Sequence, residues 1–402
     1  MRPWPAAGRV AAVAALLALG AWLWSAETGR LAPEPDVAPG GPAAVASRPQ
    51  PGAAPTVDRL PPEAAPSGAL ALATSLPAAN QAQAEAPSRA KAGAPVWDLC
   101  GVGRMPVPSG AVAQPGPEQA LAALPPHLGR DAWVQAYAAL ATALDAGPPR
   151  WRAAALMLRG SDATGWPQAL ALPELARASD DPVVAMWALQ RCDLGASCLE
   201  MAERWTQVEP QNLAPWVDLL ARQPQRRGEL ITRMAAATRF DRHEHALSQA
   251  VLEAMPAGVA SYLQPALWID VIGVEAAMAM PAFNAVFDHC REPLAPGSER
   301  MQACAAVART LVERSDGFVG VRLGLRLAER SYLGKAEAAT RRKALDTLLA
   351  PPDELFDREQ PLSCAGVART RAWVEQRARL GELGALRAQA AQRTASAASG
   401  SR

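Results

Sequence analysis

Apolar and polar residues alternate with a helical period through most of the chain after about residue 96. In Asp131–Ala146 the apolar side chains recur three or four residues apart, at Trp133, Ala136, Tyr137, Leu140 and Leu144. This spacing places them on one face of an α-helix. Helix-favouring Ala, Leu, Arg, Glu and Gln dominate the region, whereas β-favouring Ile, Tyr and Thr are sparse. We therefore expect an all-α domain over residues 97–392.

Helix-breaking clusters interrupt this pattern at short intervals. They occur at Gly147–Pro149, Gly160–Gly165, Asp193–Gly195, Gln223–Arg227, Pro293–Gly297, Asp316–Gly317 and Pro351–Asp353. Asp181 before Pro182 is typical of a helix start, because the carboxylate can cap and proline suits the first helical position. The two glycines of residues 100–103 indicate a turn. The spacing predicts an irregular array of αα-hairpins with little room for strands.

The chain opens with a different pattern. An uncharged, mostly apolar run, Val10–Trp24, follows Arg2 and Arg9. Residues 10–26 reach the lower limit of about 17 needed to span a bilayer, and the basic flank, residues 1–9, predicts a cytoplasmic amino terminus. Trp22 and Trp24 favour an uncleaved transmembrane anchor, since indoles rest at the membrane interface. We expect a single-pass protein of a bacterial inner membrane with its bulk in the periplasm. A cleaved signal peptide, giving a soluble periplasmic or secreted protein, stays open.

Two further segments lack apolar periodicity. Residues 27–96 are rich in Pro and Ala. Proline removes backbone donors and pushes the preceding residue out of the helical region, so this stretch is expected to be a disordered tether. Residues 393–402 are small and polar, and we expect a disordered tail there.

The six cysteines suit an oxidising compartment. Cys192 and Cys198 lie at the end of one expected helix, Pro182–Arg191, and the start of the next, so they flank a tight αα-hairpin loop. Cys290 and Cys304 repeat that arrangement around Pro293–Gly297. Each pair is expected to form a disulfide, which leaves Cys100 and Cys364 to pair by elimination. Because no C-x-x-C pair occurs, we expect no metal site. No dinucleotide fingerprint occurs either, so we expect no cofactor.

The charges and histidines indicate little chemistry. The 40 basic and 39 acidic residues balance, so we expect no nucleic-acid binding. The densest polar cluster is Asp241–His245, where His243 and His245 would point about 200° apart on a helix and could not share a metal. We interpret it as a solvated helix start. No nucleophile elbow or phosphate-binding loop is found, which predicts that the protein is not an enzyme.

One segment resembles a known repeat family. Residues 198–220 read CLEMAERWTQVEPQNLAPWVDLL. With Pro210 as the terminal proline, Trp205 falls at a helix-contact position and Trp216 where the next unit carries its Trp. The segment is similar to the second helix of a tetratricopeptide repeat running into the next unit. The match is limited to about residues 182–220 and departs from the family at Met186 and Leu189. It implies a degenerate array with right-handed αα stacking.

Stacked helix pairs curve and leave an extended concave face, which suits a binding protein. On the segment that resembles the repeat, Gln190 and Arg191 are expected to face a ligand, with Trp187 and Trp216 beside them; most tryptophans should otherwise fill the core. We expect a membrane-tethered periplasmic scaffold that binds a protein or peptide of the cell envelope. A periplasmic enzyme with its site assembled from separated residues, and an architectural spacer, remain alternatives.

Overall fold

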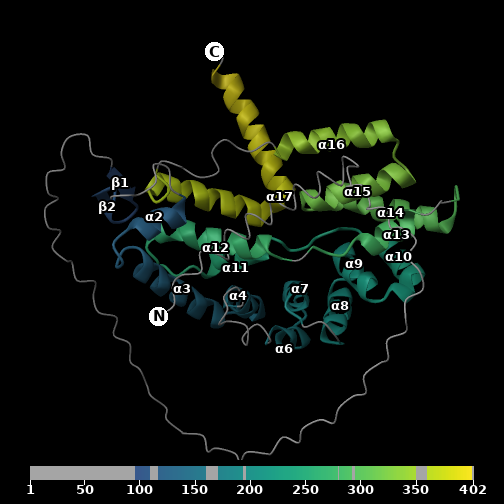
Figure 1. The fold of residues 1–402 in the computed structure, drawn as a ribbon, viewed down its shortest axis with the longest axis horizontal. Coiled ribbons are helices and arrows are strands. Elements are labelled where there is room, and N and C mark those ends of the chain that lie inside the picture. The colour runs from purple at the N-terminus through teal and green to yellow at the C-terminus, as the bar shows by residue number, and fades with distance from the viewer. Residues whose placement is uncertain are drawn as a thin grey trace, which may run out of the picture. The chain divides into compact units, whose positions relative to one another are not determined.

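The computed structural model describes residues 96–108, 116–159, 171–192, 196–278, 280–291, 295–349 and 360–400. Over these residues the chain is mostly helical, which confirms the all-α prediction (Figure 1). The apolar run over residues 10–26 and the tether up to residue 95 lie outside the described residues. Within the part of the chain that the structure describes, no helix is long and apolar enough to cross a membrane.

A two-stranded hairpin precedes the helices. The elements are β1 (Val96–Leu99), β2 (Gly103–Pro106), α2 (Pro117–Ala123), α3 (Arg130–Asp145), α4 (Pro149–Arg159), α6 (Leu172–Arg177), α7 (Pro182–Gln190), α8 (Ala196–Val208), α9 (Leu213–Arg222), α10 (Arg227–Ala235), α11 (Ala246–Ala254), α12 (Gln264–Ala276), α13 (Asn284–Arg291), α14 (Glu299–Arg314), α15 (Phe318–Ser331), α16 (Lys335–Leu349) and α17 (Cys364–Gly400). Short 3₁₀ turns, Pro224–Arg226 and Ser261–Leu263, precede α10 and α12. The predicted cap of α7 is present, because the Asp181 carboxylate accepts a 2.9 Å hydrogen bond from the Val183 N–H.

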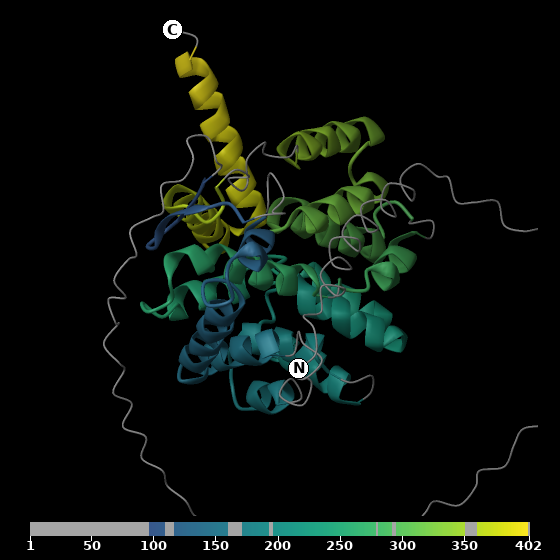
Figure 2. The same cartoon turned by 60° about the vertical axis from the view of Figure 1, so that its left-hand side comes forward.

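The β-hairpin is an addition to the predicted turn at residues 100–103. Strands β1 and β2 pair antiparallel, with Val96 opposite Pro106. The side chain of Gln360 covers the other edge of β1: its amide oxygen accepts from the Asp98 N–H at 3.0 Å, and its amide nitrogen donates to the Val96 carbonyl at 3.3 Å. The hairpin lies beside the start of α17 (Figures 1 and 2). A strand of four residues is too short to show periodicity, which explains why the sequence indicated only a turn.

Consecutive helices pack against each other along most of the domain, as αα-hairpins do. This holds from α6 to α10 and from α14 to α16. Helix α11 also packs against α3, α4 and α17, which lie far away in sequence. The main core fills the space between these helices, and Trp187, Trp205 and Trp268 are among its largest fully buried side chains. These three tryptophans therefore act as inter-helix core, as predicted for most of the tryptophans.

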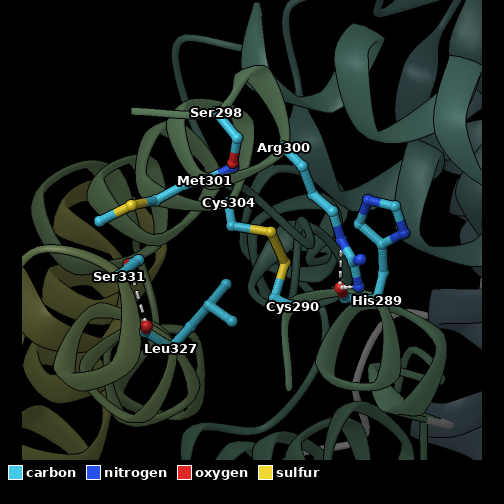
Figure 3. Close-up of a disulfide and its surroundings, with 8 residues drawn as sticks. All are labelled: His289, Cys290, Ser298, Arg300, Met301, Cys304, Leu327 and Ser331. Carbon is cyan, nitrogen blue, oxygen red and sulfur yellow. Dashed lines mark hydrogen bonds between the residues drawn. A yellow bond between two sulfur atoms is a disulfide. The ribbon is translucent and has the colours of Figure 1, made fainter. Parts of the chain in front are cut away.

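Three disulfides join the pairs predicted from the sequence. The sulfur atoms are 2.09 Å apart in Cys192–Cys198, 2.05 Å in Cys290–Cys304 and 2.06 Å in Cys100–Cys364. Figure 3 shows the second of these, between the end of α13 and the first turns of α14. Beside it, Arg300 Nε donates a 2.9 Å hydrogen bond to the carbonyl of His289, so the two helices are joined by a polar contact as well.

Helix α17 has two arms that meet at Gly381. The backbone there has φ 70° and ψ 174°, and the arms diverge from this point (Figures 1 and 2). The second arm continues to Gly400. The prediction of a disordered tail from residue 393 was therefore wrong for residues 393–400. The segment is rich in alanine, the strongest helix former, and lacks proline, so a helix can extend through it.

Candidate functional site

The residues predicted to bind a ligand divide into two groups in the structure. Trp187 is fully buried between α7 and its neighbours. Trp216 on α9 is also buried, and its indole N–H donates a 3.0 Å hydrogen bond to the Pro210 carbonyl. These two indoles pack the helices together. Gln190 and Arg191, at the carboxyl end of α7, are partly exposed and lie next to the Cys192–Cys198 disulfide.

The interpretation of Asp241–His245 as a solvated helix start was wrong. The segment leads into α11, but Arg242 and His245 are only 8% and 6% exposed. It passes between the α8–α9 turn and the α14–α15 turn, where the Phe240 N–H donates to the Arg314 carbonyl at 3.1 Å. Arg242 and His245 are therefore largely removed from water, and Asp241 and His243 contact other parts of the protein, whereas both ring nitrogens of His245 are buried without a hydrogen-bond partner.

Glu209, at the end of α8, is the centre of the first buried network. Its Oε2 lies 2.9 Å from His243 Nε2 and accepts hydrogen bonds from Trp205 Nε1 at 2.8 Å and Asn212 Nδ2 at 2.9 Å. Its Oε1 accepts from Arg239 Nη2 at 2.7 Å. Burial alone would raise the pKa of Glu209, but these contacts, led by that with His243, lower it to about 2. The carboxylate is thus a buried anion with a full set of donors.

His243 is held between two carboxylates. Its Nε2 faces Glu209, and its Nδ1 lies 3.3 Å from an oxygen of Asp241. Burial by itself would lower the pKa of His243, but the Glu209 hydrogen bond and the charges of Asp241 and Glu209 raise it. An imidazole whose two nitrogens both face carboxylates is stabilised as a cation with both positions protonated. Such a ring has no free nitrogen to act as a general base.

A second network surrounds the turn between α14 and α15. The Asp316 carboxyl group is hydrogen-bonded to Asp241, and burial together with the charges of Asp241 and Glu244 raises the pKa of Asp316 far above its ordinary value. Two carboxyl groups can share a hydrogen bond only if one of them is protonated. We therefore assign a neutral Asp316 that donates to Asp241.

The same turn binds the bend of α17. The Phe318 N–H donates a 3.0 Å hydrogen bond to Glu382 Oε2, so Glu382 caps the first turn of α15. In return, the Leu383 N–H donates to the carbonyl of Asp316 at 3.1 Å. The left-handed backbone at Gly381 makes this N–H available, because the helical ladder is interrupted there. The bend is therefore fixed by two reciprocal hydrogen bonds.

Glu275 on α12 completes this buried region. Its Oε1 accepts a 2.8 Å hydrogen bond from the Ser248 N–H, and Arg377 Nη1 lies 3.5 Å from its Oε2. Burial outweighs the attraction of Arg377 and raises the pKa of Glu275 to about 7. The charge of Arg377 also acts on His245. Burial, followed by this charge, lowers the pKa of His245 to about 3.

We call Asp241, Glu244, Glu275, Asp316 and Glu382 the acidic junction. Among the described residues, no group of three or more His, Cys, Asp or Glu side chains is arranged to hold a metal ion. Two segments of the junction stand out in the sequence: the dense polar run at residues 241–245 and the helix break at Asp316–Gly317. It gave no sign that they meet, because they lie more than seventy residues apart.

No protein-family model, curated protein or solved structure matches this chain. The resemblance of residues 182–220 to a tetratricopeptide repeat therefore stays a prediction. The two helices that it covers, α7 and α8, do pack against each other, and α8 packs against α9. Packing of this kind is common to many helical proteins and supports the fold class alone.

Proposed function

We propose that this chain is a membrane-tethered scaffold on the outer side of a bacterial inner membrane. Its helices form a degenerate tetratricopeptide-like array, and the α7–α8 helix pair binds a protein or peptide partner of the cell envelope. The amino-terminal apolar run supplies the anchor, and residues 27–95 hold the domain away from the bilayer. The proposed binding residues are Gln190 and Arg191, at the partly exposed end of α7.

The pairing of all six cysteines is the observation that supports this proposal most. Every cysteine of the chain takes part in a disulfide. Disulfides persist in oxidising compartments such as the periplasm and are rare in the cytosol. Two of the three join neighbouring helices across a loop, which suits small helical hairpins that must stay rigid outside the cell.

A catalytic function has less support. His243 is the histidine with the most elaborate surroundings, but its two nitrogens are occupied by Glu209 and Asp241. His245 is buried with a pKa lowered to about 3, so it is neutral at ordinary pH and shielded from substrate. Cys290 beside His289 is in a disulfide and offers no thiolate. Binding therefore explains the described residues better than a reaction does.

The compartment can be tested by topology reporters. A periplasm-dependent reporter such as alkaline phosphatase, fused after Arg393, should be active, whereas a fusion that needs the cytoplasm should be inactive. Activity of the cytoplasmic reporter alone would contradict the proposed localisation. Free-thiol labelling of the denatured, unreduced protein gives an independent measurement, because an extracytoplasmic chain should show no free cysteine.

Partner binding can be tested by affinity capture from solubilised envelopes. The native chain should retain a partner in stoichiometric amount, and a Gln190→Ala/Arg191→Ala variant should retain less without a lower melting temperature. Arg152→Ala, an exposed change on α4, is the matched control and should capture normally. Equal capture by all three proteins would contradict the proposed binding surface.

A further inference from the structure

Arg191 is a cation for which the part of the chain that the structure describes supplies no counter-charge. It ends α7, where its own N–H donates to the Ala188 carbonyl at 3.3 Å. Its side chain is partly buried, and its Nε is buried with no hydrogen-bond partner. Among the described residues, none forms an ion pair with its guanidinium, and burial lowers the pKa of Arg191. The protein thus holds a partly desolvated charge that no described residue neutralises.

The neighbouring arginines are different. Arg150 pairs with Asp181 at 2.8 Å, at the start of α7. Arg177 on α6 pairs with Glu200 at 2.6 Å, and Arg204 on α8 pairs with Asp180 at 2.6 Å. Each of these ion pairs joins two segments around the α7–α8 pair. Arg191 joins none, so a role in holding these helices together does not explain it.

The surroundings of Arg191 tolerate a cation but do not satisfy its donors. The carboxyl end of a helix carries a partial negative charge, which favours a cation at this position. That charge supplies no acceptor for the buried Nε–H. One helical turn earlier on the same face, the Trp187 Nε1–H is also buried without an acceptor. This end of α7 therefore has donors in excess, and a buried donor without an acceptor destabilises the free protein.

We propose that Arg191 binds a carboxylate of an acidic side chain on the partner, an inference that rests on the proposed function. A guanidinium matches a carboxylate with two parallel hydrogen bonds, and the Arg191 side chain is partly exposed, so it can be reached by a partner. A doubly charged phosphate group would favour a second cation, but Arg177 and Arg204 beside this helix pair are already neutralised by acids. A single carboxylate supplies the one charge that is missing.

The test uses the full-length chain in lipid nanodiscs and three peptide libraries. All are nonapeptides with randomised flanks that lack acidic residues; the central residue is Glu, Gln or phosphoserine. The native chain should bind the Glu library at least about tenfold more tightly than the Gln library, the size expected for a charge-assisted hydrogen-bonded pair. Arg191→Gln should abolish this preference. Arg152→Gln, which removes an equal charge from an exposed site, should keep it.

Each other outcome overturns the inference. Equal binding of the Glu and Gln libraries, or no binding of either, shows that Arg191 does not select a carboxylate. A stronger preference for the phosphoserine library identifies a different ligand class. Loss of the Glu preference in Arg152→Gln as well shows a general charge effect. If envelope capture persists while the Glu preference is absent, the carboxylate inference fails and the scaffold proposal stands. If the Glu preference is present but no partner is captured from envelopes, the scaffold proposal fails and the carboxylate site stands.

Discussion

The α7–α8 helix pair and the acidic junction both bury polar side chains, but they differ in how far hydrogen bonds compensate for that burial. In the junction and the Glu209 network beside it, carboxylates are matched by donors or share a proton. At the end of α7, Arg191 Nε and Trp187 Nε1 have no acceptor. Most carboxylates of the first region are matched within the folded chain, although Glu275 Oε2 and both ring nitrogens of His245 are buried without a hydrogen-bond partner. The second has unused capacity, which is the property expected of a surface that binds something else.

The comparison also shows that a cluster of ionisable residues need not be a reactive site. His243 between Glu209 and Asp241 resembles a catalytic arrangement when only residue types are considered. Its occupied nitrogens make it a cation that holds the α8–α9 turn to the segment before α11. For His243, the occupancy of both ring nitrogens therefore indicates a structural role that the residue types alone would not reveal.

Removal of the Glu209 carboxylate should have the largest effect. Glu209→Ala leaves His243 and Arg239 without their buried partner, and breaking a buried ion pair costs about 3–5 kcal/mol. Urea denaturation should show this loss in the free energy of unfolding. Glu200→Ala is the matched control, since its ion pair with Arg177 is exposed and should matter much less. Similar losses in both variants would contradict the central position of Glu209.

The covalent link of the helix pair should matter less. Replacing both Cys192 and Cys198 by Ala opens a loop with a sequence separation of only 6. Closing so short a loop removes little entropy from the unfolded chain, and we expect a loss of about 2 kcal/mol. Removing Cys100 and Cys364, with a separation of 264, should destabilise more. Calorimetry of the two double variants measures which one loses more stability. A larger loss on removal of Cys192–Cys198 would show that loop size does not determine how much these disulfides stabilise the fold.

The acidic junction should make stability depend on pH. The folded-state pKa of Glu275, about 7, and that of Asp316 lie above their unfolded values, so the folded protein binds more protons and loses stability as pH rises. Below about pH 6.5, the neutral burial of His245 opposes this trend, since its folded pKa is lowered to about 3. We expect the free energy of unfolding to fall by about 1–2 kcal/mol between pH 6.5 and 9.

Denaturation midpoints at several pH values provide that measurement. A Glu275→Gln/Asp316→Asn variant keeps neutral, hydrogen-bonding side chains at both positions and should flatten the decline. If the native protein instead becomes more stable from pH 6.5 to 9, the carboxyl groups of the junction are ionised in the folded state and the assignment of a neutral Asp316 is wrong.

Replacement of Arg191 should have the smallest effect on stability. Arg191→Met removes an unpaired, partly buried cation and keeps a long side chain. The free energy of unfolding should therefore change by no more than about 0.5 kcal/mol, and the melting temperature should stay the same or rise slightly. Thermal denaturation beside the native chain measures this. A loss as large as that of Glu209→Ala would show that Arg191 supports the fold, and the contrast between the two regions would disappear.

Local features of the fold could be predicted from the sequence because their causes are local. The cap of Asp181 before Pro182 depends on neighbouring residues, and α7 begins where they indicate. The break expected at Pro293–Gly297 falls between α13, which ends at Arg291, and α14, which begins at Glu299. Cys192 and Cys198 could be paired because two helix ends joined by a short loop must lie together.

The acidic junction could not be predicted because its cause is distant. Asp241, Asp316 and Glu382 come from three turns that meet only after the helices between them have packed. A run of charged residues before a helix is usually solvated, and only the tertiary contacts of Phe240 bring this one inside. The bend at Gly381 was equally hidden, since a glycine within a helical pattern does not by itself indicate a break.

The Cys100–Cys364 disulfide has a mechanical consequence. The chain enters the described domain at Val96, four residues before Cys100, and the disulfide bonds that point to the first residue of α17. A force applied between the residues before Cys100 and helix α17 is therefore transmitted through the disulfide. It does not pass through the long segment between Cys100 and Cys364. That segment is a closed loop which a pull between those two points cannot extend. Strand β1 lies outside this closed loop and could be peeled away, whereas the helices inside it would keep their shape under such a pull.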